Sequence, residues 1–206
     1  MKSALLGDSI RQNYGDSVAE VLGDGFEVYQ PPENCRFAKY TLRGLFDWEA
    51  DMRGARIVHW NNGHWDLNNL FGDGPFTSFE EYGENMIRIA KILLSRHEKV
   101  IFATTTPTDP ENKYNKNNVI IEFNEYIVPK LRELGVIIND LHKTTYQDIA
   151  KYIRHDDKIH LTPEGIRVCA EQTAQIIRSV ADELPDDAPA VSNGNKKSDG
   201  GFAVLL

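Results

Sequence analysis

The alternation of short apolar runs with longer helical patterns is the feature of this sequence that most constrains its fold. The apolar runs read as buried strands and cover residues 3–6, 26–29, 56–60, 99–104 and 136–139. Helical patterns lie between them at residues 16–22, 41–52, 79–95 and 118–134, and a final helix is expected over residues 162–184. This order predicts an α/β fold in which a mostly parallel sheet is covered by helices on both faces.

Polar residues follow three of the predicted strands. Ser9 comes after the first strand, residues 61–63 after the third and residues 104–106 after the fourth. Right-handed crossovers place the carboxyl ends of parallel strands on one edge of the sheet, where open α/β sheets bind their ligands. We therefore expect these three segments to meet at a functional site.

The chain length and a change in composition predict one domain with a tail. The 206 residues are enough for one domain with a substantial core. From Pro185 the sequence loses its periodicity and becomes rich in Pro, Gly, Ser and Asp. We predict one domain over residues 1–184 and a flexible C-terminal tail over residues 185–206.

Charge and cysteine content exclude several classes of protein. The net charge of -8 argues against nucleic acid and anionic membranes as partners. The two cysteines, Cys35 and Cys169, are too few for a disulfide framework or a four-cysteine zinc site.

The N-terminus has no signal-peptide pattern, and no stretch approaches the roughly 18 apolar residues of a membrane span. The expected location is the cytoplasm.

Residues with the chemistry of a serine hydrolase stand near the two ends of the predicted domain. Ser9 follows Gly7 and Asp8 where the first strand breaks, and Asp157 and His160 precede the last helix. A serine nucleophile needs a base, and that base needs an acid to orient it. A serine hydrolase is therefore the leading hypothesis, with the apolar neighbours of His160 favouring the neutral imidazole that a base requires.

These segments resemble the first and last conserved blocks of the SGNH (GDSL-type) hydrolases. Residues 7–9 are similar to the block that carries the nucleophile, and residues 157–161 to the block that carries the acid and the base. The resemblance spans residues 1–184. It implies a three-layer α/β/α sandwich with a flavodoxin-like, five-stranded parallel sheet. It also implies ester hydrolysis through an acyl-enzyme, with Ser9, His160 and Asp157 as the triad and no cofactor.

The two middle blocks depart from the family pattern. The second block normally offers a glycine N–H to the oxyanion, and Lys39 stands in its place; a lysine keeps that backbone N–H. The third block is normally Gly-x-Asn-Asp, whereas residues 59–66 here have Trp65 in the asparagine column. We expect the oxyanion hole to use the Lys39 backbone and the Asn62 amide, with Asn61 or the Trp65 indole as alternative donors.

Aromatic residues after the third predicted strand suggest how a substrate is held. Trp60 and Trp65 lie beside Asn61 in the sequence, and exposed indoles provide stacking platforms for sugar rings. These three residues are the predicted substrate-binding set. A metal site is not expected, because His59 and His64 share no helical spacing with a third ligand and no His-Glu-x-x-His motif is present.

The predicted function is hydrolysis of short-chain acyl esters, with an O-acetyl group on a carbohydrate as the specific expectation. Part of that expectation comes from what the family does. An acyltransferase or thioesterase with the same triad stays open, as does a catalytically silent carbohydrate-binding module of the same fold. A nucleotide binder is less favoured, because the chain has no glycine-rich phosphate loop. The expected partner is a small-molecule or carbohydrate ester, and a homo-oligomer is left open.

Overall fold

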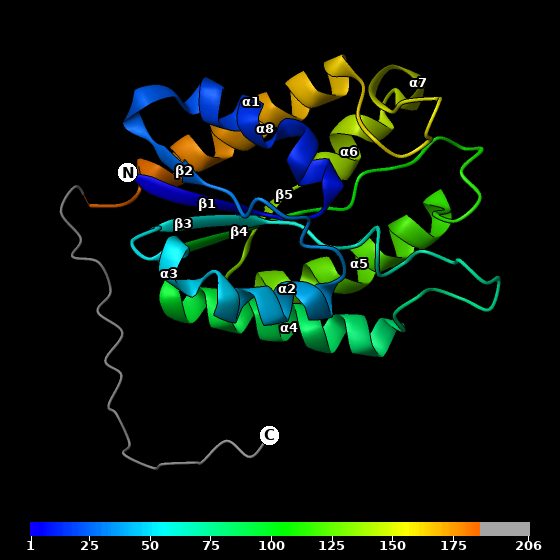
Figure 1. Ribbon diagram of the computed structural model, residues 1–206, viewed down its shortest axis with the longest axis horizontal. Coiled ribbons are helices and arrows are strands. Elements are labelled where there is room, and N and C mark those ends of the chain that lie inside the picture. Colours follow the sequence, from blue (N-terminus) through cyan, green and yellow to red (C-terminus); the bar gives the residue numbers. More distant parts are fainter. Residues whose placement is uncertain (186–206) are drawn as a thin grey trace, which may run out of the picture.

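The computed structural model describes residues 1–185 and contains one five-stranded parallel sheet (Figure 1). Nearly all of the predicted tail lies outside the described residues. The strand order is β2-β1-β3-β4-β5, and every neighbouring pair is parallel. The strands are β1 (Lys2–Leu6), β2 (Glu27–Tyr29), β3 (Ile57–Trp60), β4 (Lys99–Ala103) and β5 (Ile137–Asn139). The predicted fold class is confirmed.

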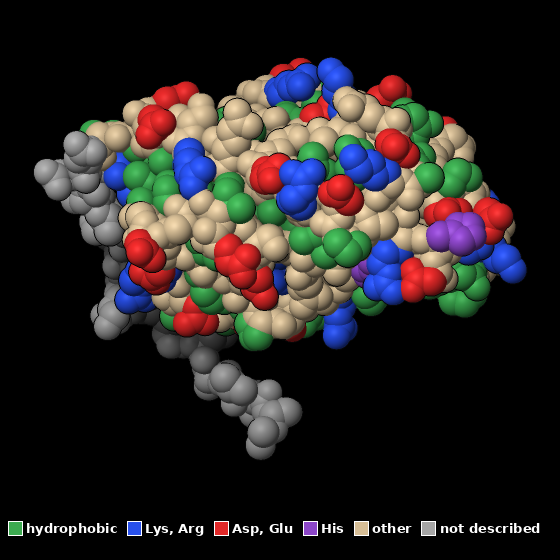
Figure 2. Space-filling view, turned by 90° about the horizontal axis from the view of Figure 1, so that it is seen from above, with side chains coloured by type: hydrophobic (Ala, Val, Ile, Leu, Met, Phe, Trp, Pro, Cys, Tyr) green, Lys and Arg blue, Asp and Glu red, His purple; other side chains and the backbone are tan. Residues whose placement is uncertain are grey.

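Helices cover both faces of the sheet and give the molecule three layers (Figure 1). The layer on one face consists of α1 (Ser9–Leu22), α6 (Leu141–Tyr146), α7 (Ile149–Tyr152) and α8 (Pro163–Ala181). The opposite layer consists of α2 (Ala38–Asp47), α3 (Glu49–Met52), α4 (Phe79–Arg96) and α5 (Asn117–Glu133). Seen from the α1–α8 side, acidic and basic side chains are interspersed over the first layer (Figure 2).

Two hydrophobic cores explain why the strand sequences are apolar without alternation. Successive strand residues point to opposite faces of a sheet. Leu6 and Val58 accordingly pack into the core under α2, α4 and α5, whereas their neighbours Leu5 and Ile57 pack into the core under α1 and α8. Both faces of the central strands are therefore dry, which requires runs of apolar residues.

The strand register brings the predicted functional segments to one edge. Leu6 pairs with Trp60, and Trp60 pairs with Phe102, so that β1, β3 and β4 end at nearly the same level. Ser9 and the residues that follow β3 and β4 consequently lie at the carboxyl edge of the sheet.

Several helix boundaries differ from the predictions for local reasons. The first helix begins at Ser9 rather than residue 16, because the Asp8 carboxylate caps it by accepting the N–H of Ile10. The helix predicted over residues 41–52 starts earlier and is divided at Trp48 into α2 and α3. The short helices α6 and α7 were not predicted. Thr162 caps α8 through the N–H of Gly165, as the sequence indicated.

Cys35 and Cys169 are buried free thiols. Among the described residues, no helix has the length and apolar character needed to cross a membrane.

Candidate active site

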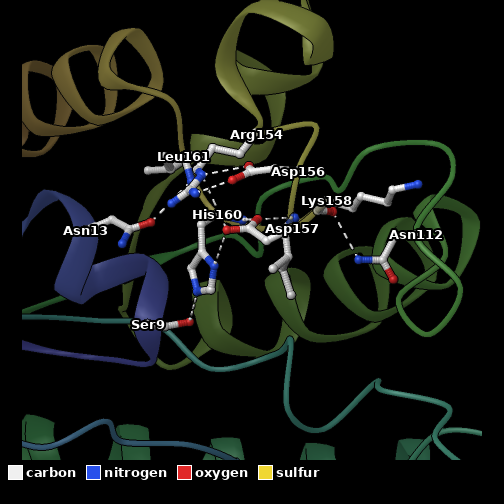
Figure 3. Close-up of polar contacts among 10 residues, drawn as sticks. Ser9, Asn13, Asn112, Arg154, Asp156, Asp157, Lys158, His160 and Leu161 are labelled. Carbon is white, nitrogen blue, oxygen red and sulfur yellow. Dashed lines mark hydrogen bonds and ion pairs between the residues drawn. The ribbon is translucent and has the colours of Figure 1, made fainter.

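Ser9 and His160, which are 151 positions apart in the sequence, meet at the carboxyl edge of the sheet (Figure 3). Ser9 is the first residue of α1 and follows directly after the turn that ends β1. Its Oγ lies 2.8 Å from Nε2 of His160. The Nδ1 atom of His160 lies 3.1 Å from Oδ2 of Asp157. The three residues proposed as a triad therefore form one continuous chain of hydrogen bonds.

The loop that carries Asp157 and His160 is fixed at both ends. Ile153 and Leu161 form an isolated antiparallel bridge, and the N–H of Arg154 donates to the carbonyl of His160. The N–H of Leu161 also donates to the side chain of Asn13 on α1, at 3.2 Å. This last contact ties the loop to the helix that begins with the serine.

The environment of Asp157 favours its ionised form. Burial raises the pKa of this carboxyl, but the backbone N–H groups of His160 and Ile159 and the His160 ring together bring the pKa below its ordinary value. Arg154 also lies 3.4 Å from the carboxylate. A carboxylate at Nδ1 holds the proton on that nitrogen and leaves Nε2 free to accept the proton of Ser9.

The structure corrects the predicted role of Asn62. This residue is fully buried, and its amide nitrogen donates to the carbonyl of Arg36 and to Oγ1 of Thr41, both at 2.9 Å. An amide group has only two hydrogens, so Asn62 has none left for an oxyanion. Its contacts instead join the end of β3 to α2.

Asn61, the alternative donor, keeps an amide hydrogen that Asn62 does not have. Its amide nitrogen donates one hydrogen to Oδ1 of Asp8, at 3.0 Å, and no described residue accepts the second. The side chain crosses directly over Gly7, where a Cβ atom would lie 1.9 Å from Oδ1 of Asn61. Gly7 therefore permits the close approach of Asn61 to the turn that carries Ser9.

Lys39 lies in the first turn of α2, where backbone N–H groups have no partner within the helix. Its side chain extends to Glu81 on α4, at 3.0 Å, and both groups are exposed. The lysine side chain therefore does not block its own backbone N–H. The preceding N–H, that of Ala38, donates to the buried carboxylate of Asp66.

A cavity of about 400 Å³ opens beside the serine and the histidine. Its lining is mostly apolar and consists of Ser9, Phe37, His64, Trp65, Asn68, Leu70, Phe76, Ile159 and His160. Trp65 is 43 % exposed and contributes to the wall. Trp60 does not, because it is fully buried and packs on Phe102 with ring centroids 5.0 Å apart. The prediction that Trp60 binds substrate is therefore wrong.

His64 forms a second part of the wall that the sequence did not indicate. Its ring nitrogens lie 3.1 Å from Oγ1 of Thr106 and 3.1 Å from the amide nitrogen of Asn115. Burial lowers the pKa of His64 to about 4, so the ring stays neutral at pH 7. No pattern in the sequence pairs His64 with Asn115, which is 51 positions away.

One surface group among the described residues brings together possible metal ligands, namely Asp109, Glu111 and His155. Each of the three side chains already has a partner, because His155 lies 2.8 Å from Asp109 and Glu111 lies 2.6 Å from Lys158. His59 and His64 do not belong to this group.

No family model and no curated protein matches the sequence. The structure is nevertheless similar to solved structures of esterases. The acetyl xylan esterase AlAXEase has a TM-score of 0.73 and 18% identity, with 86% of this chain and 100% of the other covered. A lipase/acylhydrolase from Enterococcus faecalis has a TM-score of 0.74 and 17% identity, with 87% and 96% covered.

The acetylxylan esterase Axe2 from Geobacillus stearothermophilus is also similar, with a TM-score of 0.68 and 11% identity over 85% of this chain and 93% of the other. A further similar structure, with a TM-score of 0.70 and 16% identity over 86% of this chain and 98% of the other, belongs to the lipolytic protein G-D-S-L family and comes from Veillonella parvula. At these identities the likeness shows the fold, and this chain has the SGNH hydrolase fold.

Proposed function

We propose that this protein is a serine ester hydrolase that works through an acyl-enzyme on Ser9. The observation that carries the proposal is the hydrogen-bonded chain from Ser9 through His160 to Asp157 at the edge of the sheet, with distances of 2.8 and 3.1 Å. A triad is recognised by such geometry and not by sequence position. The esterases and acylhydrolases among the similar structures support the same reaction class.

The proposed reaction has two halves. Nε2 of His160 accepts the proton of Ser9 as Oγ attacks the ester carbonyl carbon, and the imidazolium then protonates the departing alcohol. Water attacks the acyl-enzyme in the second half, giving its proton to His160, which returns it to Oγ as the carboxylic acid leaves. The backbone N–H groups of Ser9 and Lys39 and the amide of Asn61 would stabilise the oxyanion in both halves.

The proposed substrate class has two grounds: the similar proteins suggest the acyl group, and the lining of the cavity suggests the alcohol part. An acetyl group is the first acyl group to test, since two of the similar proteins are acetyl xylan esterases. Trp65, Phe37 and Phe76 offer aromatic surface beside Ser9, which suits the apolar face of a sugar ring. Acetylated carbohydrates are therefore the leading substrate candidates, and a screen of acetylated sugars with the purified protein would identify the alcohol.

The decisive experiment compares Ser9→Ala with Ser17→Ala, a substitution on the same helix away from the cavity. We expect Ser9→Ala to fold normally, to lose nearly all turnover of p-nitrophenyl acetate and to lose labelling by a fluorophosphonate probe. Ser17→Ala should retain both. Full activity of Ser9→Ala would overturn the proposal, and an unlabelled wild-type serine with tight sugar binding would favour a silent binding module.

Product analysis with added acceptor alcohols separates hydrolysis from acyl transfer. A hydrolase releases free acid in proportion to the ester consumed, whereas a transferase forms a new ester with the acceptor. A thioesterase would cleave acyl thioesters faster than the matching oxygen esters.

A further inference from the structure

Lys158 lies between the triad residues Asp157 and His160. Its backbone conformation is one that residues other than glycine disfavour. Its φ angle is 67°, in the left-handed region that glycine adopts without cost. The residue sits where the chain must reverse so that the Asp157 carboxylate can accept from the His160 backbone and ring together. Other contacts must hold Lys158 in this conformation.

The loop of residues 104–116, between β4 and α5, supplies contacts to two polar groups of Lys158. The carbonyl of Lys158 accepts a hydrogen bond from the side-chain amide of Asn112, at 3.0 Å (Figure 3). It also accepts the N–H of Asp109, at 3.1 Å. The Lys158 ammonium forms an ion pair with Glu111 at 2.6 Å. The carbonyl and the ammonium of the strained residue are thus bound by one neighbouring loop, and its N–H donates to the carbonyl of Arg154, at 3.0 Å.

Asn112 is itself fixed within that loop. It is 7% exposed, and its Oδ1 accepts the N–H groups of Tyr114 and Asn115, both at 2.9 Å. Asn115 in turn donates to the carbonyl of His64 in the cavity wall, at 2.9 Å. A continuous set of hydrogen bonds therefore joins the triad loop to the wall of the cavity.

We propose that Asn112 and Asp109 are positioning residues, which hold Lys158 in the left-handed conformation and thereby keep His160 within reach of Ser9. If Lys158 relaxed to a negative φ, the peptide groups on either side would rotate and carry His160 away from the serine. Asn112 touches neither the triad side chains nor the cavity. Its effect on hydrolysis rests on the proposed function, whereas its effect on the geometry of His160 does not.

Asn112→Asp is the sharpest test, because it keeps Oδ1 for Tyr114 and Asn115 and replaces only the group that donates to Lys158. We expect kcat for p-nitrophenyl acetate to fall at least tenfold while KM changes less than twofold. Asn117→Asp, at the first residue of α5, is the matched control. It removes a donor to the carbonyl of Thr108 and should change kcat less than twofold.

Rescue by glycine separates positioning from a general loss of structure. Glycine accepts the left-handed conformation, so in a Lys158→Gly background Asn112→Asp should lower kcat less than threefold. An equal loss in both backgrounds would overturn the proposal. Should Asn112→Asp fail to fold, Lys158→Gly and Lys158→Ala provide a second comparison. Both lose the contact with Glu111, but only alanine retains the strain, so the glycine variant should be at least threefold more active, and the reverse order would overturn the proposal.

A measurement without substrate keeps this inference separate from the proposed function. The proton on Nδ1 of His160, bound to Asp157, should give a downfield NMR signal in the free protein. We expect Asn112→Asp to weaken or remove this signal and Asn117→Asp to keep it. An intact signal in Asn112→Asp would overturn the positioning role. A wild-type protein that shows the signal and cleaves no ester would instead overturn the hydrolase assignment alone.

Discussion

The carboxylate of Asp157 accepts three hydrogen bonds, two from backbone N–H groups and one from the His160 ring. The backbone bonds fix the direction of the carboxylate before any substrate is present. The bond to the ring selects the tautomer that leaves Nε2 free for the serine. The Asp157 side chain thus determines both the orientation of the His160 ring and which ring nitrogen carries the proton.

Asp157→Asn should lower kcat/KM for p-nitrophenyl acetate by about 10³- to 10⁴-fold. The asparagine would present an N–H to Nδ1, so that the ring proton moves to Nε2 and blocks transfer from Ser9. Asp156→Asn is the control, because Asp156 contacts Arg154 and is not part of the triad. More than a tenth of wild-type activity in Asp157→Asn would contradict the assignment.

The neighbouring residues Asn61 and Asn62 should respond to alanine in different ways. Asn61→Ala removes the proposed oxyanion donor and should reduce kcat by about 10²- to 10³-fold. Asn62→Ala removes two buried hydrogen bonds and should lower the free energy of unfolding by about 2 kcal/mol. Denaturant titration beside steady-state kinetics measures both effects. A larger loss of kcat in Asn62→Ala would reverse this division of roles.

At the level of single residues, the sequence predicted side chains that belong to a motif. It did not predict the roles of side chains that depend on contacts with residues distant in the sequence. Ser9, His160 and Asp157 were singled out because their types and order match the chemistry of a serine hydrolase, and the structure places their side chains together. Asn62 was misjudged because its amide is used by Arg36 and Thr41, which no spacing along the chain reveals. Trp60 was misjudged because the last residue of a central strand can point into the core.

At the scale of elements, the first residue of α2 is hydrogen-bonded to a buried acidic side chain, that of Asp66. The Asp66 carboxylate accepts the N–H of Ala38 at 2.9 Å and is fully buried. Burial raises its pKa to about 7, although the Ala38 N–H and the Thr77 side chain act in the opposite direction. The start of this helix therefore contains a group that titrates near neutral pH.

This titration has a predictable effect on stability. The folded pKa lies above the ordinary value of 3.8, so the fold favours the neutral acid and the free energy of unfolding decreases as pH rises from about 4 to 7. The contribution is on the order of 4 kcal/mol. Asp66→Asn should remove it, and urea titrations at several pH values would show the difference. An unchanged pH dependence in Asp66→Asn would contradict the raised pKa.

The residues at which helices begin and end were harder to predict than the presence of the helices themselves. The sequence over residues 9–15 has little apolar periodicity, and α1 starts there because Asp8 provides a cap and α8 covers its inner face. The final helix was placed well, because Thr162 and Pro163 form a local start signal that needs no tertiary contact.

At the scale of the whole molecule, two buried imidazoles should make the fold sensitive to acid. Burial lowers the pKa of His59 to about 3 and that of His64 to about 4. The unfolded chain takes up these protons near pH 6.5 and the folded chain does not, so their contribution to stability is lost as pH falls below 6.5. For His64 the loss by pH 4 is on the order of 3 kcal/mol.

As pH falls from about 7 to 4, protonation of Asp66 increases the free energy of unfolding, whereas the two buried histidines decrease it. Variants of single residues therefore give a clearer result than the wild type alone. His64→Asn should flatten the acid side of the stability curve, and His155→Asn should not, because the His155 side chain is 78% exposed. Thermal unfolding between pH 4 and 7 would measure both. Equal curves for His64→Asn and the wild type would contradict the prediction.

The parallel sheet itself was the most predictable part of the molecule, because continuous apolar strands separated by helices allow few other arrangements. That prediction implied that segments from both ends of the chain meet. The lining of the cavity was less predictable, since Phe37, Leu70 and Ile159 come from three separate loops. Their proximity depends on loop geometry that leaves no periodic signal.

The positions of Met1 and Pro185 have a practical consequence. The carbonyl of Pro185 accepts a hydrogen bond from Arg56, whose own backbone N–H donates to Lys2, so both ends of the described chain lie beside the starts of the central strands (Figure 1). Attachment to a bead or sensor chip through a linker at Met1 would direct the serine and its cavity toward the bulk liquid. An immobilised preparation should therefore keep the cavity accessible to large molecules.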